Sequence, residues 1–162
     1  MKEDLIINSL KEKFQTNILE AVNTSPRRVT VKVSQAVLLD VIKFLRDDFK
    51  FYHLSTITGL DAPAGAGDFE MQYHFANELA VVTVSTMVPR AELKMKSICA
   101  IIPGAVLYER EIQDMFGIVV ENIPDPRPLV MPDDWEEGNY PLRKDWKFER
   151  KPEVIPGEKN GS

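Results

Sequence analysis

The sequence predicts an α+β fold, in which one largely antiparallel five-stranded sheet carries its helices on one face. Segments of helical periodicity alternate with strand-like segments in the order α-β-β-α-β-β-β-α. Three of the links between strands are short or turn-like, which favours antiparallel neighbours packed under helices. A proline-rich segment follows the last helix. We therefore expect a two-layer sandwich with an extended C-terminal tail.

Length and composition restrict the class of protein. The 162 residues, 44% hydrophobic and 28% charged, are typical of one globular domain with a sizeable core. A net charge of −5 gives no electrostatic basis for binding nucleic acid. No apolar run approaches the roughly 20 residues needed to cross a bilayer, so we expect a cytoplasmic chain without direct membrane insertion. The single cysteine, Cys99, excludes an internal disulfide and a cysteine-held iron–sulfur cluster or zinc site.

The first half of the chain supplies a helix, two strands and a second helix. Residues 4–14 place apolar side chains at helical spacing, and the runs 17–23 and 28–33 are strand-like. Ser34 is expected to cap the second helix. The core stripe of that helix consists of Val37, Leu38, Val41, Ile42, Leu45 and Phe49.

Three strands follow the second helix. Residues 51–58 are aromatic and β-branched, and residues 69–75 alternate apolar with polar side chains. Residues 79–87 form the most apolar run, which predicts a central strand. The glycine-containing segment 59–68 is expected to be a hairpin loop, and residues 91–101 are expected to form a short helix.

The helix predicted over residues 105–116 has two distinct faces. The arc expected to face the sheet consists of Ala105, Tyr108, Ile112, Met115 and Phe116. The opposite arc interleaves Leu107 with Arg110, Glu111 and Asp114, whereas a solvated face would not normally place leucine among its charges. We expect this arc to dock on another chain, with Arg110 and Asp114 able to pair with each other or with the partner.

The residues after this helix are expected to form an extended partner-binding tail over 118–148, attached to a core domain of residues 1–117. Prolines favour extended backbone and lower the entropy lost when a segment is fixed against a surface. Large aromatic side chains argue against disorder up to residue 148, whereas residues 149–162 are expected to be disordered. The candidate interface residues of the tail are Asp125, Arg127, Trp135, Tyr140, Arg143, Lys144, Asp145 and Trp146.

Catalysis by the chain itself has one candidate pair. Glu111 and Asp114 would act as acid and base in a stand-alone enzyme, but no histidine, serine nucleophile or metal cluster lies near them in sequence. Acidic residues of this kind usually belong to solvated or salt-bridged helix faces.

A metal site has weaker support. His53 and His74 lie in predicted neighbouring strands, where Asp61 or Asp68 could serve as a third ligand. However, the alternation of the second strand places His74 on its solvated side. We therefore expect surface or hydrogen-bonded histidines and no bound metal.

Several motifs resemble the 30-kilodalton subunit family of respiratory complex I. Residues 108–118, YEREIQDMFGI, closely resemble the family signature ERE-x-x-DMFGI, and residues 141–145, PLRKD, resemble the end of the same signature. Residues 132–135, PDDW, stand between them, and residues 55–61, STITGLD, are similar to the family's S-x-TG-x-D strand end. Residues 123–128, IPDPRP, depart from the usual HPDLRR. The departure looks more like the homologous subunit of membrane-bound, energy-converting nickel–iron hydrogenases.

The resemblance implies a cofactor-free structural subunit in the peripheral arm of a complex I-like NADH:quinone oxidoreductase or an energy-converting hydrogenase. Such a subunit would dock a large, hydrogenase-like subunit and a small iron–sulfur subunit, for electron transfer to quinone or protons coupled to ion translocation. Iron–sulfur clusters, and any nickel–iron, flavin or quinone site, would belong to those partners. The complex would place the chain on the cytoplasmic side of the cell membrane. The stand-alone acid/base enzyme and a soluble scaffold or assembly module remain as alternatives.

Overall fold

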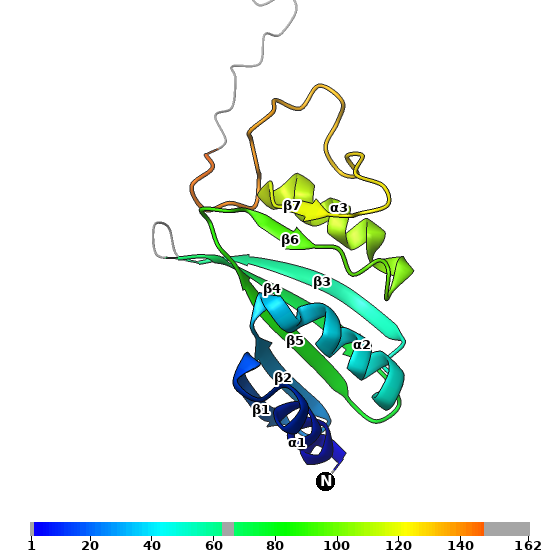
Figure 1. Ribbon diagram of the computed structural model, residues 1–162. Coiled ribbons are helices and arrows are strands. Elements are labelled where there is room, and N and C mark those ends of the chain that lie inside the picture. The colour runs from blue at the N-terminus through cyan, green and yellow to red at the C-terminus, as the bar shows by residue number, and fades with distance from the viewer. Residues whose placement is uncertain (1, 63–66, 148–162) are drawn as a thin grey trace, which may run out of the picture.

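The computed structural model describes residues 2–62 and 67–147 and contains three helices, a large sheet and a small one (Figure 1). The helices are α1 (Lys2–Phe14), α2 (Leu38–Phe49) and α3 (Val106–Phe116). The strands are β1 (Ile18–Ser25), β2 (Arg28–Val33), β3 (His53–Asp61), β4 (Phe69–Ala76), β5 (Val81–Val88), β6 (Lys94–Lys96) and β7 (Val119–Glu121). Short 3-10 turns, Gln15–Asn17, Gln35–Val37 and Pro103–Ala105, precede β1, α2 and α3.

The large sheet has the strand order β1-β2-β5-β4-β3. Strands β1 and β2, β4 and β5, and β3 and β4 pair antiparallel, whereas β2 and β5 run parallel because α2, β3 and β4 intervene between them in the chain. The most apolar strand, β5, is central, as predicted. The predicted α+β fold and its largely antiparallel five-stranded sheet are confirmed.

One face of this sheet carries the core. Along β4, Phe69, Met71, Tyr73 and Phe75 are buried and alternate with half-buried polar residues, as the period of a strand requires. Helices α1 and α2 lie over this face, and their apolar stripes join the same buried cluster (Figure 1). Phe116 of α3 packs edge-to-face on Phe69 with ring centroids 5.8 Å apart, so the third helix also covers this face.

Two local expectations for the first half of the chain differ from the structure. The Ser34 hydroxyl does not cap a helix: it donates to Oδ1 of Asn17 at 3.0 Å, and α2 begins only at Leu38, after a 3-10 turn. Strand β3 continues to Asp61, into the segment predicted as a loop, because it pairs with β4 as far as Phe69. Residues 63–66 of that loop lie outside the described residues.

The prediction of a helix over residues 91–101 is wrong. Lys94 and Lys96 are exposed and flank the buried Met95, which is strand periodicity, and this strand β6 pairs in parallel with β7. The backbone N–H of Ser97 donates to the carbonyl of Glu121 at 2.9 Å and extends the pairing. A short strand whose partner lies more than 20 residues away leaves little local signal in the sequence.

The core extends beyond residue 117, where the sequence predicted the tail to begin. Ile118, just before β7, and Val120, within it, are buried and join the core cluster, so we place the end of the core at Glu121, the last residue of β7. The predicted disordered stretch 149–162 lies outside the described residues.

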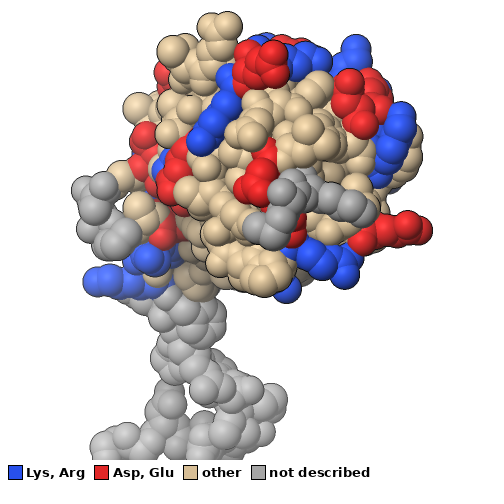
Figure 2. Space-filling model, turned by 90° about the horizontal axis from the view of Figure 1, so that it is seen from below, with Lys and Arg blue, Asp and Glu red and all other residues tan. Residues whose placement is uncertain are grey.

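The surface carries mixed charge. In the view of Figure 2, basic and acidic side chains are interspersed with uncharged ones, and neither sign dominates. None of the helices described is long and apolar enough to cross a membrane.

Candidate docking surface on helix α3 and the C-terminal segment

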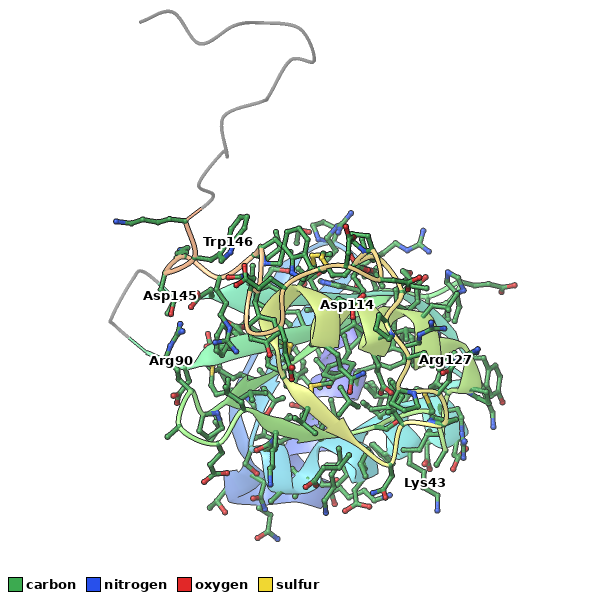
Figure 3. The ribbon with its side chains drawn as sticks, turned by 90° about the horizontal axis from the view of Figure 1, so that it is seen from above. Lys43, Arg90, Asp114, Arg127, Asp145 and Trp146 are labelled. Atoms are coloured by element: carbon green, nitrogen blue, oxygen red, sulfur yellow. The ribbon has the colours of Figure 1, made fainter. Side chains whose placement is uncertain are left out.

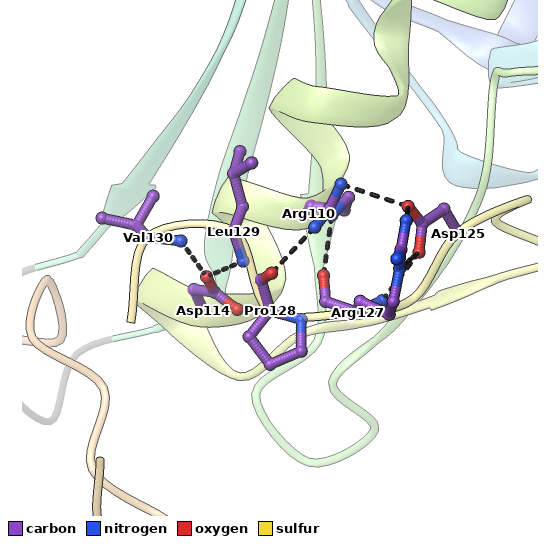
Figure 4. Close-up of polar contacts among 7 residues, drawn as sticks. All are labelled: Arg110, Asp114, Asp125, Arg127, Pro128, Leu129 and Val130. Atoms are coloured by element: carbon purple, nitrogen blue, oxygen red, sulfur yellow. Dashed lines mark hydrogen bonds and ion pairs between the residues drawn. The ribbon is translucent and has the colours of Figure 1, made fainter. Parts of the chain in front are cut away.

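Arg110 projects from α3 and binds the C-terminal segment (residues 122–147) at three points (Figure 4). Its Nε donates to the carbonyl of Arg127 at 2.7 Å and its Nη2 to the carbonyl of Pro128 at 2.8 Å. Its Nη1 pairs with Oδ2 of Asp125 at 3.2 Å. The planar guanidinium offers five donors in a fixed geometry, which is why one side chain can satisfy all three acceptors.

Asp114 binds the next residues of the same segment, one helical turn further along α3. Its Oδ2 accepts the backbone N–H groups of Leu129 and Val130, both at 2.8 Å (Figure 4). It also accepts the N–H of Met131 at 3.4 Å. Successive backbone N–H groups turned toward one point form a concave anion-binding site, here filled by a carboxylate of the same chain. We call Arg110, Asp114 and residues 125–131 the clasp.

An ion pair inside the segment supports the clasp. Arg127 binds Asp125 through two bonds, Nε to Oδ1 at 2.8 Å and Nη2 to Oδ2 at 2.7 Å. These bonds from the Arg127 side chain, its backbone N–H and the nearby Arg110 hold the pKa of Asp125 well below its usual range. Asp125 therefore stays ionised at neutral pH and keeps its contact with Arg110.

A second attachment lies at the C-terminal end of α3. The N–H of Leu142 donates to the carbonyl of Met115 at 3.2 Å, and Nε of Arg143 donates to the carbonyl of Phe116 at 2.6 Å. The Arg143 guanidinium lies 4.3 Å from the centroid of the Tyr140 ring, which covers Gly117. These bonds satisfy helix carbonyls that otherwise lack a partner at the end of a helix.

The end of β3 holds the segment at a third place. The buried carboxylate of Asp61 accepts the backbone N–H of Lys144 at 2.9 Å and pairs with Arg90. Arg90 also reaches Asp145 at 3.6 Å, and the two side chains face each other in Figure 3. Asp61, a candidate metal ligand on the sequence alone, therefore serves as an anchor for the C-terminal segment.

Between these attachments the segment forms a closed loop that lies above α3 (Figure 1). The indole rings of Trp135 and Trp146 lie 6.1 Å apart, and Nε1 of Trp135 donates to the carbonyl of Asn139 at 2.9 Å. The loop carries an exposed acidic group around Trp135, formed by Asp133, Asp134, Glu136 and Glu137.

Large apolar side chains remain exposed on this side of the molecule. Leu107 on α3 is 51% exposed, and Val130 and Leu142 in the C-terminal segment are 52% and 53% exposed. Exposed apolar groups surrounded by charge are typical of surfaces that bind another protein. Their fixed backbone means that little conformational entropy would be lost on binding.

The predicted interface residues therefore fall into several groups on this side of the molecule. Arg110, Asp114, Asp125 and Arg127 meet in the clasp, where the two α3 side chains bind the C-terminal segment and not each other. Tyr140 and Arg143 lie at the end of α3, and Lys144 and Asp145 lie beside the end of β3. Trp135 and Trp146 pack together, and Leu107 and Glu111 are exposed on α3. Contact of any of these residues with a partner remains a prediction.

Sequence reasoning missed Glu109, whose carboxylate is fully buried. It accepts the Ser97 hydroxyl and the Ile98 N–H, both at 2.6 Å, and the Cys99 thiol at 3.2 Å. Its position four residues after Ala105 and three before Ile112 places it in the middle of the arc that faces the sheet, so helical spacing could have identified it.

Acid/base catalysis by Glu111 and Asp114 remains a prediction. One oxygen of Asp114, Oδ2, accepts three backbone N–H groups, so this carboxylate already has a structural role. Glu111 lies one turn away and is exposed.

The two histidines are separate. His53 is exposed at the start of β3, whereas His74 is half-buried in β4, with Nδ1 3.0 Å from Oγ1 of Thr83. Burial lowers the pKa of His74. Within residues 2–62 and 67–147, no three His, Cys, Asp or Glu side chains are grouped to hold a metal ion.

The sequence and the fold are similar to those of known respiratory and hydrogenase proteins. The chain is 35% identical over 144 residues to a subunit of the F(420)H(2) dehydrogenase of Methanosarcina mazei, covering 88% of this chain and 90% of that one. It is 33% identical to hydrogenase-4 component G of Escherichia coli, covering 88% of this chain but only 26% of that longer protein.

A solved structure gives the same picture at the level of the fold. A chain of the membrane-bound sulfane sulfur reductase, an archaeal respiratory membrane complex, superposes with a TM-score of 0.80 at 30% identity, covering 91% of this chain and 86% of that one. The family model for the 30 kDa subunit of the respiratory-chain NADH dehydrogenase matches residues 31–152, which include the second half of β2, all of β3 to β7 and the clasp. The chain therefore belongs to the respiratory-chain NADH dehydrogenase 30 kDa subunit family.

Proposed function

We propose that this chain is a structural subunit in the peripheral arm of a complex I-like oxidoreductase or an energy-converting hydrogenase, and that it carries no redox cofactor. The observation that carries the proposal is the clasp. Arg110 and Asp114 fix an otherwise extended segment on the outer side of α3, so that helix and segment form one preorganised surface. A chain with no partner gains little from holding apolar side chains in this exposed position.

The partners that fit this proposal are a large, hydrogenase-like subunit and a small iron–sulfur subunit. The family is defined by a subunit of a respiratory enzyme, and the relatives named above belong to a dehydrogenase, a hydrogenase and a respiratory membrane complex. Holding two such subunits in register keeps the distances between their redox centres short. The chain would lie on the cytoplasmic side of the membrane through these partners.

The residues of the chain are consistent with a subunit that holds no redox cofactor of its own. Iron–sulfur clusters need cysteine thiolates, and the one cysteine of the sequence, Cys99, is buried beside Glu109. Burial raises the pKa of the Cys99 thiol to about 11, so it stays protonated and is a poor ligand at neutral pH. Clusters, and any nickel–iron, flavin or quinone site, would then belong to the partners.

Co-purification tests the proposal. The tagged chain is expressed with the large and iron–sulfur subunits, and the eluate is analysed for both proteins and for cluster absorbance. We expect both partners in the eluate, and we expect the double substitution Arg110→Ala/Asp114→Ala to reduce their recovery at least tenfold. The matched control is Arg28→Ala/Asp48→Ala, which removes the same charges from exposed positions on β2 and α2.

The outcome also decides between the alternatives. If the wild-type chain does not retain the two subunits, the proposal is wrong. A reaction catalysed by the isolated chain and abolished by Glu111→Gln would instead support the acid/base enzyme. Binding of unrelated proteins with loss of both redox subunits would support the scaffold module.

A further inference from the structure

We propose that the outer edge of β3 is a second docking site, which accepts an extended strand from a partner subunit with a basic side chain opposite Glu111. This inference rests on the proposed function, because it assumes that the chain works inside an assembly. It concerns a different surface from the clasp and can fail while the assembly role stands.

Strand β3 is an edge strand whose own sequence carries little protection against pairing. It is the last strand of the large sheet, and its pairing with β4 is regular from Thr56 to Asp61. Edge strands normally avoid unwanted pairing through lysine, proline or repeated bulges. The sequence of β3, HLSTITGLD, contains neither lysine nor proline, and its single irregularity lies at Ser55. The opposite edge, β1, has two register shifts in its pairing with β2.

The backbone groups of this edge point toward open space. The carbonyl of Ser55 accepts the Tyr108 hydroxyl at 3.0 Å, so it points away from β4. The N–H of Thr56 lies opposite this carbonyl in the same trans peptide and therefore faces β4. Pairing is regular from Thr56 onward, so alternation places the backbone groups of Ile57 and Gly59 on the outer edge. The Ile57 carbonyl accepts a long contact of 3.4 Å from the neighbouring Thr56 hydroxyl. In the described ranges no other strand pairs with this edge.

A groove runs between this edge and α3. It has a volume of about 190 Å³ and is lined by residues 56–59 of β3, by Ile112, Met115 and Phe116 of α3, and by Leu142 of the C-terminal segment. Gly59 leaves room for the Phe116 ring, since a Cβ there would lie 2.5 Å from Cε2 of that ring. The groove therefore offers apolar walls for side chains of an added strand next to backbone groups that can pair with it.

Charge favours a partner strand over a second copy of this chain. The lining includes the carboxylate of Glu111, which is exposed, and contains no lysine or arginine. A lysine or arginine on the incoming strand would meet an opposite charge. Pairing of two β3 edges would bring two Glu111 carboxylates to one interface, and like charges across paired strands are destabilising.

Hydrogen exchange measured on the isolated chain and on the co-purified complex tests the site directly. Within residues 56–60, we expect the outward-facing amides of Ile57 and Gly59 to exchange at least tenfold more slowly in the complex, because new strand pairing removes them from water. Amides of residues 19–24 on β1 serve as the internal reference and should exchange alike in both samples. Equal exchange of residues 56–60 in both samples overturns the proposal, even if the complex has formed through the clasp.

Reversing the charge of Glu111 provides a second test. Glu111→Lys should abolish most of the added protection of residues 56–60, whereas Glu20→Lys on the opposite edge strand β1 should leave it unchanged. Equal protection in both variants would overturn the basic partner strand. Sedimentation of the isolated wild-type chain is the remaining control: concentration-dependent dimers with protected residues 56–60 would identify a second copy as the occupant and overturn the proposal.

Discussion

Arg110 and Asp114, one helical turn apart on α3, bind adjacent stretches of the same segment through opposite backbone groups. The guanidinium takes the carbonyls of Arg127 and Pro128, and the carboxylate takes the N–H groups of residues 129–131. Neither side chain could replace the other, since an arginine only donates and a carboxylate only accepts. The pair thus fixes both the position and the direction of the segment along the helix.

Removing the carboxylate should release the middle of the segment. We expect Asp114→Ala to speed amide exchange of residues 129–131 at least tenfold, equivalent to about 1.4 kcal/mol of local stability, because three donors lose their acceptor. Hydrogen exchange with mass spectrometry measures this. Glu111→Ala, on the same face of α3 but exposed, is the control and should leave these amides unchanged. Unchanged exchange in Asp114→Ala would mean that packing alone holds the segment.

The buried carboxylate of Glu109 should matter for the whole fold. Glu109→Ala leaves the Ser97 hydroxyl and the Ile98 N–H buried without their acceptor. Each unsatisfied group costs roughly 1–3 kcal/mol, so we expect a loss of about 2–6 kcal/mol in the free energy of unfolding, measured by urea denaturation. If the variant unfolds at the same urea concentration as the wild type, water must replace the carboxylate at little cost.

The same residue shows what the sequence could and could not predict. Periodicity identified α1, α2, α3 and the five long strands, because each buries one face and repeats its apolar positions accordingly. The same spacing puts Glu109 on the inner arc of α3, but sequence reasoning did not include it there, because acids are usually assigned to solvent. The partners of Glu109 lie in the connection after β6, where a three-residue strand pairs with a strand beyond α3. Strands that are so short and so far apart in the chain leave no periodic pattern in the sequence from which their pairing could be predicted.

The candidate site was predictable as a set of residues but not as an arrangement. The charged arc of α3 and the aromatic, proline-rich segment each carry a recognisable pattern. Their mutual binding could not be inferred, because a side chain that binds a backbone carbonyl or N–H leaves no complementary charge in the sequence. The contact between Arg110 and the Pro128 carbonyl is of this kind.

Gly117 should be the least tolerant of the glycines described. It ends α3 with a φ of +65°, and a Cβ there would overlap the Tyr140 ring. Gly117→Ala should therefore cost roughly 1–3 kcal/mol and detach Tyr140, measured as a lower melting temperature and increased tyrosine exposure. Gly104→Ala is the control, since no atom lies within 4 Å of its added Cβ. Equal melting temperatures for both variants would show that the helix end relaxes easily.

Cys99 should be unreactive in the folded chain. With its pKa raised to about 11 by burial, the thiolate fraction at pH 8 falls about two orders of magnitude below that of an ordinary cysteine. Alkylation of the folded chain by iodoacetamide at pH 8 should therefore be at least a hundredfold slower than alkylation of the urea-unfolded chain. Both rates are measured at the same reagent concentration and temperature. Because the side chain is also buried, raising the pH to 9 should leave the folded rate low. Rapid labelling of native protein would contradict the burial beside Glu109.

The position at which the core ends can be tested by truncation. A chain ending at Asn122 keeps β7 and should stay folded, whereas a chain ending at Gly117 loses β7 together with the buried Ile118 and Val120. Each buried aliphatic side chain contributes about 1.5–3 kcal/mol, and 1 kcal/mol shifts the melting temperature of a domain of this size by about 2–4 °C. We therefore expect the shorter chain to melt at least 6 °C below the longer one, measured by circular dichroism. Equal melting temperatures would place the boundary at residue 117, and the small sheet would then be part of the docking surface and dispensable for the core.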